Sequence, residues 1–222
     1  MIVERTIILN NREILYEINY KKIKNCYLRV EHGKIKISAS KFHSIKVIED
    51  LIKSHQNIVL KQIDGYENKV NYQDNGFVYL FHKKYKLIVR DLKMNKCVIH
   101  DDKIYIYSSR IQETLDIFLK EQLYDYIFLK IKEYIKKDFC LSMPDIQIKK
   151  MKRRWGACFY TQNKVCFNFH LVYLDYDLID YVIVHELCHF IEANHSKKFY
   201  LEIEKRLPNY RILEKKLKEV SL

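Results

Sequence analysis

Alternating apolar and polar residues predict paired β-strands over the first forty residues. Two strand pairs are separated by short polar turns, Asn10-Asn11 in the first pair and Glu31-His32-Gly33 in the second. Asparagine and glycine accept the backbone angles that tight hairpins need. The predicted strands are Thr6–Leu9, Glu13–Asn19, Cys26–Val30 and Lys34–Ser38.

Apolar residues then recur at helical spacing, which predicts a helix over about Ser44–Gln62. A loop bracketed by Gly65 and Gly76 follows it. Period-two alternation returns beyond the loop. The strands predicted there are Phe77–His82, Tyr85–Arg90, Lys96–His100 and Lys103–Tyr107.

The second half of the chain has mostly helical periodicity. A long apolar stripe predicts a helix over Ile111–Lys137, and the wholly apolar Tyr181–Val184 is typical of a buried helix. Further elements are expected at Ile146–Met151, Lys164–Asn168, Lys197–Leu207 and Arg211–Val220. The pattern therefore predicts an α+β fold, with a β-rich region at 1–108 followed by a second region at 109–222.

The buried helix continues into His185-Glu186-Leu187-Cys188-His189, a match to H-E-x-x-H. Four residues on a helix amount to about 40° of rotation, so the two histidines share one face. Both imidazoles can then reach one zinc ion, while Glu186 lies beside them as a base that does not bind the metal. An unpaired polar cluster on a buried helix is costly, and a bound metal removes that cost.

His195 is the expected third ligand, and three histidines with an open position are typical of a catalytic zinc site. Six further helical residues would turn His195 away from the others, so the helix must end between about Phe190 and Asn194. Asn194 suits the turn because asparagine tolerates left-handed backbone. Glutamates from a later helix compete for the same role, namely Glu202, Glu204 and Glu214.

Three stretches together resemble the YgjP-like (DUF45) metallopeptidases, which are related to the SprT-like zincins. They are Arg154–Cys158, Ile179–His189 and Asn194–Phe199. Ala157 stands where that family commonly has serine. The resemblance implies a zincin-like domain with an active-site helix, zinc held by His185, His189 and His195, and Glu186 as the catalytic base. It also implies that Ile111–Lys137 backs that helix and that Lys164–Asn168 is the sheet edge that receives substrate.

Composition adds limits to this picture. The net charge of +12 is compatible with an acidic partner such as nucleic acid, although heavy use of Lys, Ile, Tyr and Asn indicates a general bias. Six cysteines form no C-x-x-C pair, so a cytosolic protein with reduced thiols is expected. Cys158 and Cys166 are expected to face each other across a hairpin that turns near Gln162. No apolar run is long enough to span a membrane, and no internal repeat is visible.

The function predicted from the sequence is zinc-dependent hydrolysis of a peptide or protein substrate. The developing oxyanion needs a further donor, and the candidates are Arg154, Tyr160, His170, Tyr173 and Tyr200. The alternatives are a hydrolase for another bond and a zinc-stabilised binding module, for which nucleic acid is a candidate partner. An intact Glu186 argues against the binding module, because a structural metal site needs no base.

Overall fold

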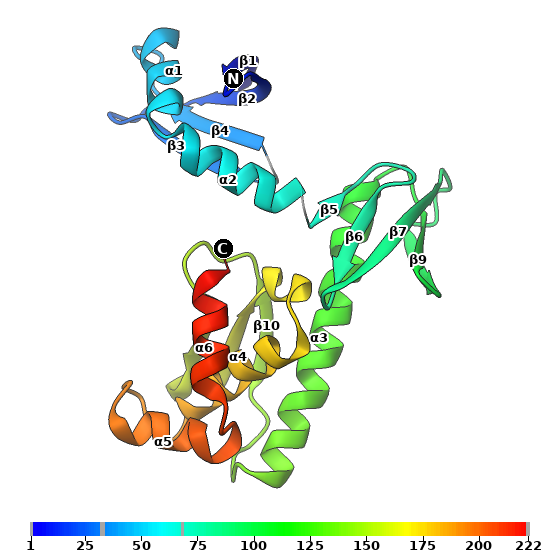
Figure 1. Cartoon of the computed structure of the whole chain (residues 1–222), viewed down its shortest axis with the longest axis vertical. Coiled ribbons are helices and arrows are strands. Elements are labelled where there is room, and N and C mark those ends of the chain that lie inside the picture. The colour runs from blue at the N-terminus through cyan, green and yellow to red at the C-terminus, as the bar shows by residue number, and fades with distance from the viewer. Residues whose placement is uncertain (1, 32–33, 68, 221–222) are drawn as a thin grey trace. The chain divides into compact units, whose positions relative to one another are not determined.

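The computed structural model describes residues 2–31, 34–67 and 69–220, which form two compact units. The first unit covers Met1–Asn71 and the second covers Tyr72–Leu222. Both are shown in Figure 1. The boundary at residue 108 remains a prediction about independently folding domains. His32 and Gly33 of the second predicted turn lie outside the described residues.

Two hairpins build the sheet of the first unit, as the sequence predicts. Asn10 and Asn11 have φ angles of 46° and 59°, the left-handed values of a tight hairpin turn. The sheet order is β1-β2-β4-β3, and β2 and β4 pair in parallel. The strands are β1 (Ile2–Leu9), β2 (Arg12–Tyr20), β3 (Tyr27–Glu31) and β4 (Lys34–Ala39).

The single helix expected after this sheet is two helices, α1 (Ile45–Ser54) and α2 (Gln56–Glu67). The break is at His55, where side chains compete for backbone groups. Ser54 Oγ donates to the Leu51 carbonyl over 2.9 Å, and His55 Nδ1 lies 3.0 Å from the same oxygen. Apolar side chains of both helices are buried with those of the strands in one core. The short β5 (Val70–Asn71) ends this unit.

The second unit begins with four neighbouring strands in the order β6-β7-β9-β8. They are β6 (Phe77–Leu80), β7 (Lys83–Arg90), β8 (Lys96–His100) and β9 (Lys103–Tyr107). The predicted strand to His82 ends earlier, because Phe81 and His82 form the hairpin turn with φ angles of 51° and 65°. The Phe81 N–H donates to the Val172 carbonyl, which ties this turn to the segment before the active-site helix.

The two units share a topology that their sequences do not reveal. In each, two antiparallel hairpins are joined by a parallel pairing of their inner strands, β2 with β4 and β7 with β9. Helices follow each sheet, α1 and α2 in the first unit and α3 (Ile111–Lys137) in the second. The expectation of no internal repeat therefore holds for the sequence but not for the topology.

The zincin-like part of the second unit contains a further sheet in the order β10-β12-β11. Its strands are β10 (Asp145–Lys149), β11 (Gly156–Phe159) and β12 (Lys164–Asn168). Helix α3 backs the H-E-x-x-H helix α4 (Tyr176–Cys188), as the resemblance implies, and α5 (Lys197–Arg206) and α6 (Tyr210–Glu219) also pack on α4. Figure 1 shows α3 and α6 along opposite sides of α4. The α+β fold with an H-E-x-x-H helix is thus confirmed.

Candidate metal centre

Helix α4 holds the H-E-x-x-H residues in the interior of the second unit. Asp175 is its N-cap residue, and Tyr181, Val182, Ile183 and Val184 are all buried, as expected of a helix that is apolar on every side. His185 and Glu186 lie in the last turn, and His189 is the C-cap residue. The helix is anchored to α3 by Tyr126, whose hydroxyl donates to Asp180 over 2.6 Å.

The chain turns directly after His189 and brings His195 back to the helix. The turn is closed by the Phe190 and Glu192 N–H groups, which donate to the carbonyls of Leu187 and Cys188. Helix α4 therefore ends at Cys188, slightly before the expected range. Asn194 does not have a positive φ angle, so the expected left-handed turn there is wrong. Ser196 then caps α5, with Oγ accepting from the Phe199 N–H.

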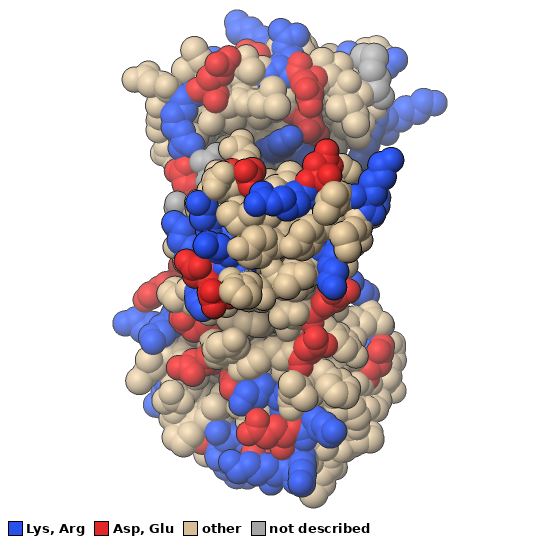
Figure 2. Space-filling model, turned by 90° about the vertical axis from the view of Figure 1, so that its right-hand side faces the viewer, with Lys and Arg blue, Asp and Glu red and all other residues tan. Residues whose placement is uncertain are grey.

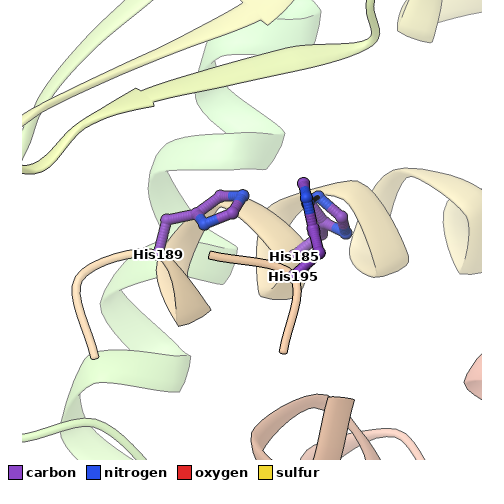
Figure 3. A group of neighbouring side chains, drawn as sticks. All are labelled: His185, His189 and His195. Carbon is purple, nitrogen blue, oxygen red and sulfur yellow. Dashed lines mark hydrogen bonds between the residues drawn. The ribbon is translucent and has the colours of Figure 1, made fainter. Parts of the chain in front are cut away.

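Three imidazoles converge at this turn. His185, His189 and His195 offer ligand atoms that all lie within 4.8 Å of one another, and the Nε2 atoms of His185 and His195 are 3.0 Å apart. Figure 3 shows the His189 ring directed toward the other two. Two nitrogens bound to one zinc at tetrahedral angles lie about 3.3 Å apart, so the cluster fits a metal ion.

The tautomers implied by the hydrogen bonds also suit a metal. His189 Nδ1 donates to the Glu192 carbonyl over 3.3 Å, which leaves its Nε2 lone pair free toward the other histidines. Burial, and then the neighbouring His189 and His195, lowers the pKa of His185 to about 3, so this imidazole is neutral as a ligand must be. His185 Nδ1 is buried without a partner among the described residues, so a metal at Nε2 would leave the Nδ1 proton without an acceptor there.

Phe199 is the common neighbour of the three histidines. Its ring centroid lies 5.0 Å from that of His185, 4.6 Å from His189 and 4.7 Å from His195, and its side chain is fully buried. Sequence reasoning gave Phe199 no role beyond its place in a resembling stretch. An apolar residue on an amphipathic helix carries no signal that separates such a support from ordinary core.

Glu186 is only 6% exposed, although it is charged in its ordinary state. Burial raises its pKa to about 8, while the Arg154 guanidinium and a hydrogen bond from the Cys158 N–H act in the opposite direction. A carboxylate with a pKa near neutrality suits proton transfer at physiological pH. The structure thus brings Glu186 beside the histidine cluster without making it part of the cluster.

These residues lie in a cleft of about 520 Å³. One wall is α4, another is β11 with the preceding Arg154 and Trp155, and α6 contributes Glu214, Leu217 and Lys218. Of the oxyanion candidates, Arg154 and Tyr160 line the cleft, whereas His170, Tyr173 and Tyr200 do not. Sequence reasoning missed Tyr181 and the α6 wall.

The competing glutamates do not join the histidines. Glu202 is held by Arg206 at 2.8 Å and by Lys205, and Glu204 is not a member of the cluster. Glu214 lines the cleft but pairs with Lys218 at 2.9 Å. Among the described residues the only group suited to a metal is the histidine triad, which favours His195 over a glutamate as third member.

Two expectations about the small sheet are wrong. Lys164–Asn168 is β12, the central strand between β10 and β11, so it is no edge for a substrate. The hairpin turning near Gln162 exists, but Cys158 pairs with Val165 and Ala157 with Cys166, which places the two cysteines on opposite faces. The first error concerns strand order and the second concerns register. A register shift of one residue moves every side chain of a strand to the opposite face of the sheet.

Asn168 fastens the segment that leads into β11. Its side chain is fully buried, with Nδ2 donating to the carbonyls of Met151 and Arg154 over 2.8 and 2.9 Å. The Asn168 N–H also donates to the Trp155 carbonyl over 2.8 Å. These contacts hold Arg154 and Gly156 at the cleft. A buried asparagine at a strand end can hold a neighbouring segment by hydrogen bonds to its backbone. The sequence did not show that Asn168 is buried.

The basic run 149–154 is partly neutralised within the fold. Lys150 pairs with Asp116 over 2.8 Å and lies 5.0 Å from the Phe169 ring centroid. Figure 2 shows Lys and Arg interspersed with Asp and Glu on the face that it views. A nucleic-acid partner, suggested by the net charge, therefore remains a prediction. All six cysteines are free thiols, and no described helix has the length and apolarity to cross a bilayer.

One family profile covers most of the chain, including the three histidines. The profile of the YgjP-like, metallopeptidase domain matches residues 24–220. Among solved structures, this chain is similar to two metallopeptidase zymogens, abylysin of Pyrococcus abyssi and jannalysin of Methanocaldococcus jannaschii. Abylysin is 18% identical over 46% of this chain and 90% of its own, with a TM-score of 0.34. Jannalysin is 24% identical over 44% and 94%, with a TM-score of 0.37. Among curated proteins, none matches the chain.

Proposed function

The chain belongs to the YgjP-like metallopeptidase family, and we propose that it hydrolyses peptide bonds with a zinc ion held by His185, His189 and His195. The observation that carries this proposal is a buried carboxylate, Glu186, in one cleft with three converging imidazoles. Three histidines are a typical donor set for catalytic zinc. A structural site has no use for an adjacent base.

When bound, zinc would supply Lewis-acid chemistry that polarises a carbonyl and makes water more acidic. The residues of the chain do the rest. Glu186 takes the proton of the attacking water and passes it to the leaving amine, a role that its raised pKa suits. Arg154, which lines the cleft and acts electrostatically on Glu186, is the proposed donor to the developing oxyanion.

The substrate is proposed to bind along β11, which replaces β12 in this role. Strand β11 pairs with β12 on one side only and lines the cleft. An extended peptide added to such an edge gains main-chain hydrogen bonds, with loose demands on side-chain identity. This arrangement places the peptide backbone alongside Glu186 and the histidines.

The proposal is tested by comparing wild type with Glu186→Gln and His195→Ala. The amide keeps the shape of Glu186 but cannot accept a proton as a carboxylate does. Glu186→Gln should retain one zinc per chain and lose about 10²–10⁴-fold in peptide turnover, the usual contribution of a positioned base. His195→Ala should lose zinc affinity and activity together.

Zinc content, thermal stability and cleavage of a peptide library are measured on the same preparations. Cleavage by Glu186→Gln at the wild-type rate would remove Glu186 from the mechanism. Stoichiometric zinc with no cleavage by wild type would move the binding-module alternative ahead. A salt-sensitive nucleic-acid complex that is indifferent to Glu186→Gln would support that alternative directly.

A further inference from the structure

Gly156 lies directly against the carboxylate arm of Glu186. A Cβ atom built at residue 156 would lie 2.6 Å from Glu186 Cγ and 2.7 Å from Cδ, and it would also collide with Oε1. Contacts this short are essentially never seen for real Cβ atoms. Rotation about the Cγ–Cδ bond moves only the carboxylate oxygens, so it does not relieve the collisions with Cγ and Cδ. Only glycine therefore accommodates Glu186 in its observed conformation.

The same strand supplies a hydrogen bond to the carboxylate. The Cys158 N–H donates to Glu186, and Gly156 and Cys158 are two residues apart, so their backbone groups face the same strand edge. Trp155 directs its carbonyl toward β12, where it accepts from the Asn168 N–H. By alternation, the edge at Gly156 and Cys158 is the outer one, beside the cleft. Strand β11 thus gives Glu186 both the space for its stem and a donor for its oxygen.

We propose that Gly156 is a positioning residue, which together with the Cys158 amide holds the Glu186 carboxylate in its working place beside the histidines. This inference rests on the proposed role of Glu186 as base. Neither α4 nor β11 can move easily to make room for an added methyl group. Glu186 belongs to a buried helix, and β11 is paired with β12 over its whole length. An added methyl group at residue 156 would therefore displace the carboxylate and leave the three imidazoles in place.

The first test is Gly156→Ala, measured on a fluorogenic peptide that wild type cleaves. Zinc content should be unchanged, because no ligand is altered. A displacement of the base by about 1 Å lowers kcat by about 10²-fold. KM should stay the same, because the added methyl points toward Glu186 and not along the strand edge that pairs with substrate. A wild-type kcat, or a loss confined to KM, would overturn the proposal.

The second test removes the colliding atoms and does not depend on activity. Gly156→Ala is introduced into wild type and into Glu186→Ala, which lacks Cγ, Cδ and Oε1, and thermal midpoints are compared. The substitution should lower the midpoint in wild type and leave it unchanged in the Glu186→Ala background, because contacting residues couple. Equal losses in both backgrounds would contradict the proposal.

A crystal structure of Gly156→Ala completes the test. The Glu186 carboxylate should be shifted relative to His185, and an unmoved carboxylate would overturn the inference. These readouts also separate two failures. If wild type cleaves no peptide, the proposed function fails, while the midpoints and the carboxylate position still decide whether Gly156 positions Glu186.

Discussion

At the scale of single residues, the candidate metal centre is packed against a side chain that is not one of its proposed ligands. Phe199 contacts all three imidazoles from the first turn of α5, and that turn is fixed by the Ser196 cap. An imidazole has two torsions to restrain before its nitrogen can meet a metal at a set distance. A rigid aromatic ring packed against three such groups restrains them together, which reduces the entropy lost on binding.

Phe199→Leu should therefore weaken zinc binding although every ligand is intact. We expect a loss of about 10- to 100-fold in affinity, the range found when supports around metal ligands are altered. Competition with a chromophoric chelator measures it. Ile203→Ala is the control, because Ile203 is equally buried, one turn further along the same helix. If both variants lose zinc affinity in proportion to their loss of folding stability, Phe199 contributes only to core packing.

The residues of the candidate site could be predicted from the sequence because their spacing carries the chemistry. His185, Glu186 and His189 fall together on any helix, and His195 needs only one turn of the chain. Gly156, Asn168 and Phe199 could not be predicted in the same way. Gly156 contributes the absence of a side chain, Asn168 contributes buried hydrogen bonds, and Phe199 contributes ring contacts. Each contribution depends on which distant segment packs against the residue.

At the scale of elements, α4 is fixed by the long helix behind it. Asp180 on α4 is largely buried, accepts from the Tyr126 hydroxyl at 2.6 Å and lies 3.7 Å from Lys130 on α3. Burial raises the pKa of Asp180, and the two partners on α3 oppose that shift. The active-site helix is therefore held to its neighbour by a polar contact at its N-terminal half and by apolar packing elsewhere.

Tyr126→Phe should destabilise the second unit by about 1.5–3 kcal/mol, the range for a hydrogen bond to a charged group. The ring and its packing on Phe81 and Tyr176 remain, so the loss is that of the hydroxyl. Denaturant unfolding measures it. Tyr124→Phe, on the exposed side of the same helix, should change stability by less than about 0.5 kcal/mol. A loss of equal size in both variants would exclude the Asp180 contact as the cause.

Local pairing could be predicted from the sequence, and long-range pairing could not. Asn10-Asn11 marks a turn between strands that follow one another, so its hairpin was predicted correctly. The successive strands Lys96–His100 and Lys103–Tyr107 were also predicted, and they pair as a hairpin. The parallel pairs β2 with β4, β7 with β9 and β10 with β12 join strands separated by other elements. No turn chemistry specifies such pairs. The same limit explains why β12 was wrongly expected to be an edge strand.

At the scale of the whole molecule, two units with separate cores share one chain, and the metal site belongs to the second. Tyr16 is fully buried in the first unit and donates to Glu49 over 2.9 Å, far in sequence from any metal-site residue. A ligand that binds only the folded state stabilises the unit that contains its site. Zinc should therefore stabilise residues 72–222 and leave residues 1–71 unaffected.

Calorimetry of the full chain should show two transitions, of which only one responds to zinc. At a free zinc concentration 1,000 times Kd, the stabilisation is about 4 kcal/mol, which raises the midpoint of a unit of this size by about 10 °C. Removal of the metal with a chelator should reverse the shift. Tyr16→Phe should lower the zinc-insensitive transition alone. A single transition that moves as a whole with zinc would mean that the units unfold together.

A further substitution decides between the compact units and the boundary predicted at residue 108. Ile104 is fully buried in β9, after residue 71 and before residue 108. Ile104→Ala leaves a cavity and should cost about 2–5 kcal/mol wherever its core lies. If residues 72–222 fold as one body, the zinc-sensitive transition moves. If the β-rich region to residue 108 folds as a domain, the zinc-insensitive transition moves and the zinc response is unchanged.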